Sequence, residues 1–135
     1  MNTGHDGSLT TVHANSPRDA MSRIETMVMM AGFDLPIRAI REQVASAIDL
    51  VVQTARMRDG TRKIMSIAEV VGMEGDIVTM QEIVTYKMLG YSNETVQGQF
   101  EHTGVQPQCI KRFEEHGIVF DATQLGGMAL PAGLR

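Results

Sequence analysis

Two histidines near the start of the chain, His5 and His13, are the residues whose type and spacing could do chemistry. A polar loop with glycines at positions 4 and 7 surrounds the first, and a β-branched run leads to the second. A neutral imidazole can donate a hydrogen bond to a phosphate oxygen, and a protonated one adds positive charge. Gly4 and Gly7 let the backbone approach an anion with no Cβ in the way. The segment is therefore a candidate for handling an anionic group.

The residues around these histidines predict a strand followed by a helix. Leu9 to Ala14 is expected to be a short buried strand because residues 10–12 are β-branched, which places the histidines at its two ends. Ser16 is then a good N-cap, Pro17 suits the first helical position, and Asp19 lies where a capping-box acid belongs. Apolar residues spaced by three and four form one stripe, and Gly32 is expected to end the helix.

The remaining sequence predicts a second amphipathic helix, three antiparallel strands and a short final helix. The expected ranges are 36–47 for the second helix, 50–54, 61–71 and 77–86 for the strands, and 107–117 for the last helix. Asp34 is expected to cap the second helix, and Asp59-Gly60 is a strong hairpin turn because both residues tolerate positive φ. The predicted fold is α/β: strand, helix, helix, antiparallel meander and C-terminal helix. We expect residues 1–90 to form the main unit and residues 91–135 an extension with a flexible tail.

The charge balance argues against a general nucleic-acid binder. The net charge of the 135 residues is −4, whereas such binders carry a strong basic excess. Positive charge is nevertheless concentrated at Arg56, Arg58, Arg62 and Lys63. Clusters of this kind are usually solvated faces, but beside a phosphate loop the same cluster could bind a nucleotide or a partner. The sequence does not distinguish these roles for the three arginines.

The composition is that of one soluble domain. Eleven methionines against six aromatic residues predict either an adaptable core or a methionine-rich face that contacts a neighbouring subunit. Cys109 is the only cysteine, which rules out an intrachain disulfide and fits a reducing compartment. The N-terminus lacks the order of a signal peptide, and the longest apolar run, Met27 to Phe33, is far shorter than the ~20 residues that span a bilayer. We expect a cytoplasmic chain with no transmembrane segment.

Three alternatives to an anion site follow from the residues alone. A single histidine on a strand, such as His13, is commonly a satisfied core residue. The two histidines with Asp6 could begin a zinc or iron site, but their spacing matches no closed ligand set, and the other two histidines are remote in the sequence. A serine hydrolase is the weakest alternative, since Ser8 does not lie in a G-x-S-x-G turn.

The order of the motifs resembles the type II/IV secretion ATPases, and within them the CpaF-like ATPases of Flp (tight-adherence) pilus assembly. The resemblance covers residues 1 to about 118 and is specific, because several long motifs occur in the right order. These motifs are T-G-H-D-G-S (3–8), T-V-H-A-N-S-P (11–17), S-R-I-E-T-M-V-M-M-A-G (22–32), R-E-Q-V-A-S-A-I-D (41–49), E-V-V-G-M-E-G (69–75) and F-E-H-T-G (100–104), with a proline at 107.

That resemblance implies a RecA-like domain of the P-loop NTPase class. The family forms a hexameric ring at the cytoplasmic face of the inner membrane and hydrolyses ATP between subunits. The first two motifs would be its histidine box, with Thr3, Gly4, His5, Gly7 and His13 facing the nucleotide. The two histidines would lie near the terminal phosphate, where they sense bound nucleotide or hold the subunit interface. They would not be its principal ligands.

The sequence departs from the family's pattern in one large respect. It has no phosphate-binding loop of the form G-x-x-x-x-G-K-[ST] and no Gly-Lys pair. The acidic residues that position Mg²⁺ and water in the family precede its histidine box, so they would lie before Met1. We therefore expect the C-terminal half of a motor domain, from a truncated or split gene, that does not hydrolyse ATP alone.

The expected partners are copies of the chain, the missing N-terminal half, and secretion or pilus platform proteins of the inner membrane. The alternative is a catalytically inactive structural or interaction fragment that binds no nucleotide.

Overall fold

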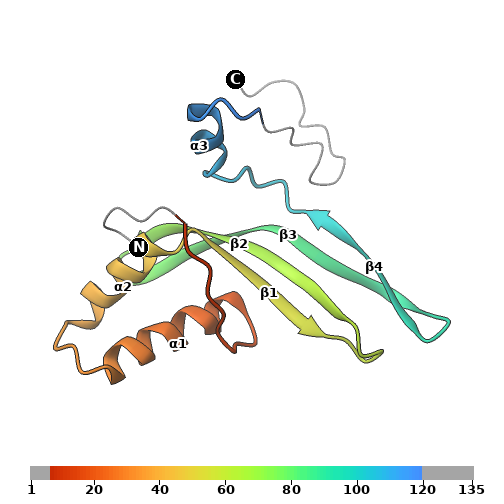
Figure 1. Ribbon diagram of the computed structural model, residues 1–135, viewed down its shortest axis with the longest axis horizontal. Coiled ribbons are helices and arrows are strands. Elements are labelled where there is room, and N and C mark those ends of the chain that lie inside the picture. The colour runs from red at the N-terminus through yellow and green to blue at the C-terminus, as the bar shows by residue number, and fades with distance from the viewer. Residues whose placement is uncertain (1–6, 120–135) are drawn as a thin grey trace.

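The computed structural model describes residues 7–119, which form two helices, a four-stranded antiparallel sheet and a third, short helix (Figure 1). In chain order the elements are α1 (Pro17–Met30), α2 (Ile37–Ala47), β1 (Leu50–Arg56), β2 (Arg62–Glu74), β3 (Ile77–Ser92), β4 (Thr95–His102) and α3 (Ile110–Glu115). The predicted mixed α/β composition is confirmed at this level, and the placement of the chain in a RecA-like domain stays a prediction.

The helix boundaries follow local signals. Ser16 is extended and accepts a hydrogen bond from the backbone N–H of Asp19, so α1 begins as predicted. Gly32, with φ of +81°, directly follows the C-cap residue, as expected for a left-handed helix end. The predicted cap of α2 is wrong: Pro36 occupies the N-cap position, and no side chain hydrogen-bonds that helix end.

The predicted strand at Leu9–Ala14 is wrong. Residues 7–14 form no regular secondary structure, and the side chain of Leu9 is fully exposed. β-branched residues favour a strand only where a neighbouring strand pairs with them, and here no ladder forms. The segment is attached at its end, where the side chain of Gln53 on β1 donates a hydrogen bond of 3.0 Å to the carbonyl of Ala14.

The sheet is a meander with strand order β1-β2-β3-β4. The predicted antiparallel strands are confirmed as β1, β2 and β3, and β4 was not predicted. β2 pairs with the first half of β3 and β4 with its second half. Three register shifts between β2 and its neighbours, and one between β3 and β4, bend the ladders. The expected division after residue 90 falls inside β3, and the division itself stays a prediction.

The apolar core lies between one face of the sheet and the first two helices. Its buried members come from all of these layers: Met21, Ile40, Val44, Val70 and Val78. α3 lies on the opposite side of the sheet (Figure 1). Met21 is buried in the core, whereas Met27, Met29 and Met30 are exposed on α1, and contact of that face with a neighbouring subunit stays a prediction. Within residues 7–119, no helix is long and apolar enough to cross a bilayer.

Candidate functional site

The predicted histidine segment is described only in its second part. Thr3, Gly4 and His5 lie outside the described residues, so the pairing of the two histidines stays a prediction. Gly7 has φ of +82°, a conformation that favours glycine, and its approach to an anion stays a prediction. His13 is exposed to solvent, which argues against a satisfied core histidine and leaves its imidazole accessible to a ligand.

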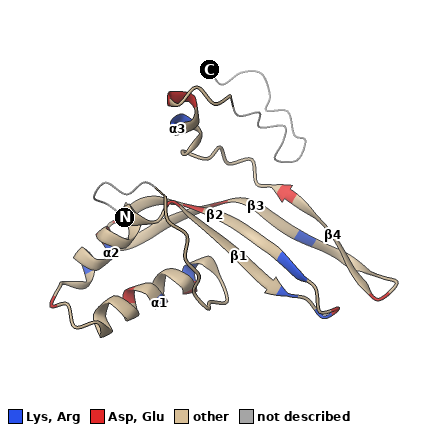
Figure 2. Ribbon diagram, in the orientation of Figure 1, with Lys and Arg blue, Asp and Glu red and all other residues tan. Residues whose placement is uncertain are grey.

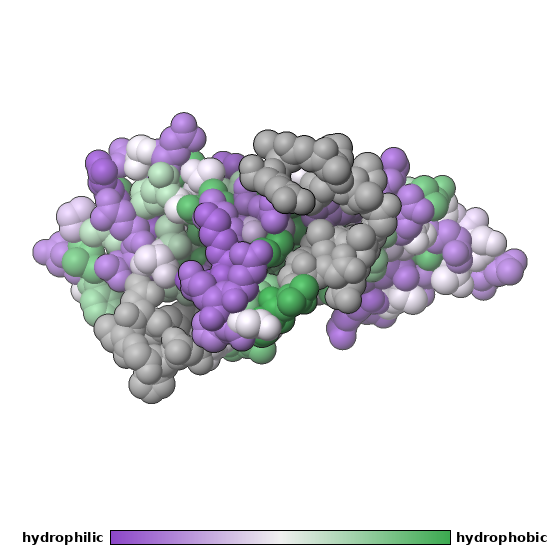
Figure 3. Space-filling view, turned by 90° about the horizontal axis from the view of Figure 1, so that it is seen from above, coloured by the Kyte–Doolittle hydropathy of each residue, from purple (hydrophilic) through white to green (hydrophobic). Residues whose placement is uncertain are grey.

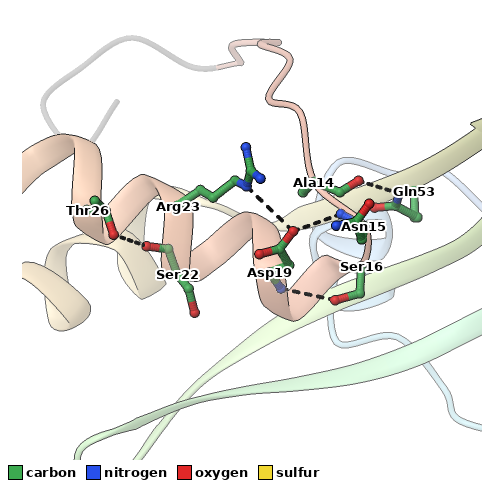
Figure 4. Close-up of polar contacts among 8 residues, drawn as sticks. All are labelled: Ala14, Asn15, Ser16, Asp19, Ser22, Arg23, Thr26 and Gln53. Carbon is green, nitrogen blue, oxygen red and sulfur yellow. Dashed lines mark hydrogen bonds and ion pairs between the residues drawn. The ribbon is translucent and has the colours of Figure 1, made fainter.

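The N-terminus of α1, next to His13, is already filled by the protein's own side chains (Figure 4). Asp19 accepts a hydrogen bond of 2.8 Å from the backbone N–H of Asn15, and Ser16 accepts one of 3.1 Å from that of Asp19. Arg23 lies 3.6 Å from the same carboxylate. An anion approaching this positive helix end would meet the charge of Asp19. The start of α1 is thus occupied by the chain's own carboxylate, and a contact of His13 with an anion stays a prediction.

The position of His13 is fixed through its neighbour. Because Gln53 holds the carbonyl of Ala14, the backbone directly after His13 is attached to the edge strand β1 (Figure 4). The exposed His13 is therefore next to a residue that is attached to the sheet.

The sequence did not predict a second polar centre, built around Glu69 on β2. This glutamate is only 4% exposed, and its oxygens accept hydrogen bonds of 2.8 Å from the backbone N–H groups of Gln108 and Cys109. The side chain of Gln81 donates a third, of 2.9 Å. Burial by itself would raise the pKa of Glu69, but these hydrogen bonds outweigh it and the pKa is lowered. The carboxylate is therefore ionised at neutral pH and holds the start of α3 to the sheet.

Glu69 lies at an open polar cleft of about 210 Å³ between the sheet and α3. At this cleft Arg112 of α3 lies 3.0 Å from Asp49. Burial, followed by the charge of Glu69, raises the pKa of Cys109, so the sulfur is a neutral thiol and a poor nucleophile. In the part of the chain that the structure describes, no three His, Cys, Asp or Glu side chains are placed to share a metal ion. The polar groups at this cleft thus hold α3 and its start in place.

One sequence signal could have identified Glu69. It stands in the otherwise apolar run Ile67–Val71, and a charged residue at a buried strand position requires partners. Those partners come from residues about 40 positions later, which local patterns do not reveal.

Comparison with known proteins places the motifs of this chain in one family. Residues 1–109 match the family model described as Type II/IV secretion system protein. A protein named for conjugal transfer in Mycobacterium tuberculosis (strain CDC 1551 / Oshkosh) is 36% identical over 77 residues, which is 57% of this chain and 21% of that protein. The conjugal transfer protein TrbB of Rhizobium radiobacter is 35% identical over 74 residues, or 55% of this chain and 20% of TrbB. The matched segment thus spans about a fifth of the length of these curated relatives.

Proposed function

Since the chain belongs to the type II/IV secretion system protein family, we propose that it is part of an ATP-hydrolysing motor for pilus assembly or type II/IV secretion. In that motor it contributes the histidine box to the nucleotide site. The observation that carries this proposal is the exposed His13 on an anchored backbone, inside the matched range. The CpaF-like subgroup is part of the proposal.

In this proposal the nucleotide is held mainly by residues other than those of the histidine box. The chain has no phosphate-binding loop, and the N-terminus of α1 is occupied by Asp19. The described residues therefore do not form an ATP and Mg²⁺ pocket by themselves. We propose that His13, together with His5, completes a pocket whose phosphate loop and metal ligands come from another segment or another polypeptide.

The proposed partners follow from the same incomplete site. They are further copies of the chain, in a hexamer, and a segment that carries the phosphate loop. An exposed apolar stretch that includes Met27, Met30 and Phe33 supports contact with such a partner, because exposed apolar groups of this size favour burial. The assembly would work in the cytoplasm at the inner membrane, with platform proteins of the secretion or pilus machine.

The alternative function is that of an inactive structural or interaction fragment. One observation favours it: the buried carboxylate of Glu69 and the carboxylate of Asp19 are both committed to holding helices. In that case the chain would bind partners without contacting a nucleotide.

ATP turnover with and without a complementing segment tests the proposal. The segment is the phosphate-loop part of a related ATPase, fused ahead of residue 1 or added separately. The chain alone is expected to show no turnover above a His13→Ala variant. With the segment, turnover should appear, and His13→Ala should lower it about tenfold or more, the size of one hydrogen bond to a charged group.

The matched control is His116→Ala, which removes an exposed histidine on the far side of the sheet and should leave turnover unchanged. Turnover by the chain alone would show that a second segment is not needed. Absence of nucleotide binding by the well-folded complemented protein would favour the inactive fragment.

A further inference from the structure

Three arginines lie at or beside the turn between β1 and β2, and we call them the arginine tip: Arg56, Arg58 and Arg62. Figure 2 shows the basic residues gathered at this turn. Arg56 ends β1, Arg62 begins β2, and the two are direct cross-strand partners. Arg58 lies in the turn between them. All three side chains are exposed.

The cross-strand pairing of Arg56 with Arg62 is unfavourable unless an anion relieves it. Like charges directly opposite each other on paired strands destabilise the pair. Among the described residues, no ion pair includes any member of the arginine tip. The tip is therefore a concentrated positive charge with no partner of its own within residues 7–119.

Asp59 is the only acid in the hairpin turn, and it is committed elsewhere. One carboxylate oxygen accepts hydrogen bonds from the backbone and hydroxyl of Thr61, at 2.9 and 2.7 Å. The other accepts one of 2.7 Å from the backbone N–H of Val96 on β4. The Val96 bond, followed by that from the Thr61 hydroxyl, lowers the pKa of Asp59. Its oxygens thus fix the turn instead of pairing with the arginine tip.

The turn between β1 and β2 is closed by a backbone hydrogen bond and a glycine. Met57 and Thr61 are joined by a backbone hydrogen bond of 2.7 Å, and Gly60 closes the turn with φ of +84°. A Cβ placed on Gly60 would lie 3.8 Å from a terminal nitrogen of Arg56. The Arg56 side chain therefore folds over the turn.

The end of the molecule that carries the hairpins is mainly hydrophilic when seen from above (Figure 3).

We propose that the arginine tip binds a phosphate group. A terminal phosphate has three oxygens that accept hydrogen bonds from several guanidinium groups at once, whereas a carboxylate has two and suits a single bidentate arginine. The ligand class is a phosphate exposed at the end of a larger molecule, either free in solution as in a polyphosphate or carried by a lipid headgroup. The tip would bind this group whether or not the chain joins an ATPase motor.

The test compares the full chain with a triple variant, Arg56→Gln, Arg58→Gln and Arg62→Gln. A matched control, Arg23→Gln, Arg38→Gln and Lys111→Gln, removes the same number of positive charges at other exposed positions. Pyrophosphate binding is measured by calorimetry, and lipid binding by sedimentation with phosphatidic acid vesicles against phosphatidylcholine vesicles. Circular dichroism verifies that all proteins are folded, and the exposure of the substituted side chains makes folding the expected result.

We expect the wild-type chain to bind one of the two phosphate probes, and the tip variant to bind it at least tenfold more weakly. The affinity of the control variant for that probe should stay within about twofold of the wild-type affinity, because net charge alone contributes little at moderate salt. Binding of pyrophosphate identifies a free phosphate as the source, and binding only of phosphatidic acid vesicles identifies a lipid. Failure of both probes, an equal loss in the control, or equally tight binding of a polyglutamate with matched charge would overturn the proposal.

Discussion

The carboxylate of Glu69 on β2 accepts a 2.8 Å hydrogen bond from the backbone N–H of Cys109, just before α3. The adjacent N–H, at Gln108, donates a second bond of the same length. The next residue of β2, Val70, faces the opposite side and packs into the core beneath the first two helices. Successive strand residues thus attach a different layer to each face of the sheet, as the alternation of side chains along a strand requires.

Replacing Glu69 with glutamine should destabilise the protein by about 1–3 kcal/mol, the range for leaving buried donors poorly satisfied. An amide offers one acceptor oxygen, and its NH₂ group faces the N–H groups it should accept from. Urea unfolding measures the change in free energy, and amide hydrogen exchange at residues 108–116 should accelerate. Glu74→Gln, at the exposed end of β2, is the control and should change neither quantity. Unchanged exchange in the Glu69 variant would contradict an anchoring role.

The same carboxylate predicts a pH dependence. Because the pKa of Glu69 is lowered on folding, its stabilising effect is complete above the ordinary glutamate pKa of about 4.3 and is lost as the pH falls through the folded value. The stability difference between wild type and Glu69→Gln should therefore be constant near neutral pH and shrink below about pH 4. The other carboxylates are the same in both proteins, so their titration does not contribute to this difference. A difference that is flat down to pH 2 would mean that the charge is not what holds α3.

Asp19 should contribute measurably to the start of α1. Asp19→Ala removes the acceptor for the N–H of Asn15 and a negative charge at the helix N-terminus, and we expect a loss of about 0.5–2 kcal/mol. Asp34→Ala is the matched control, since Asp34 precedes the other helix but caps nothing there. Thermal unfolding of both variants measures the contrast. Equal melting temperatures would refute the capping role of Asp19.

Gly98 on β4 should tolerate no side chain. A Cβ at this position would lie 2.5 Å from both the carbonyl oxygen of Lys87 and the ring of Tyr86. Gly98→Ala should thus destabilise the β3–β4 pairing by about 1–3 kcal/mol through overpacking. The neighbouring exposed residue provides the control, Gln97→Ala, which should have little effect. Denaturant unfolding compares the two, and similar midpoints would show that the strands move apart at little cost.

The sequence predicted those elements whose signals are local. The signals for α1 are confirmed, since Ser16 is its N-cap and Gly32 follows its C-cap residue with positive φ. β4 was missed because its residues are largely polar and its strand form depends on pairing with β3. Its turn has Asn93 and Glu94 at positive φ, and glutamate gives no signal for that conformation.

The candidate site divides in the same way. His13 was proposed from its type and its neighbours; it is exposed, and its role at a ligand stays a prediction. The strand proposed to hold it was wrong, because strand formation needs a partner that local sequence does not reveal. Glu69 was missed as a functional anchor, since its donors lie 39 and 40 residues further along the chain. Both the wrong strand and the missed Glu69 thus depend on contacts between segments that are distant in the sequence.

The strands follow one another across the sheet in the order in which they follow one another along the chain. Each can pair with the strand synthesised just before it, so the sheet can grow while the chain leaves the ribosome. Glu69 emerges long before Gln108 and Cys109, and until they arrive Gln81 is its remaining hydrogen-bond partner. A nascent chain that ends before Gln108 would therefore make only one of these three hydrogen bonds to the buried carboxylate of Glu69.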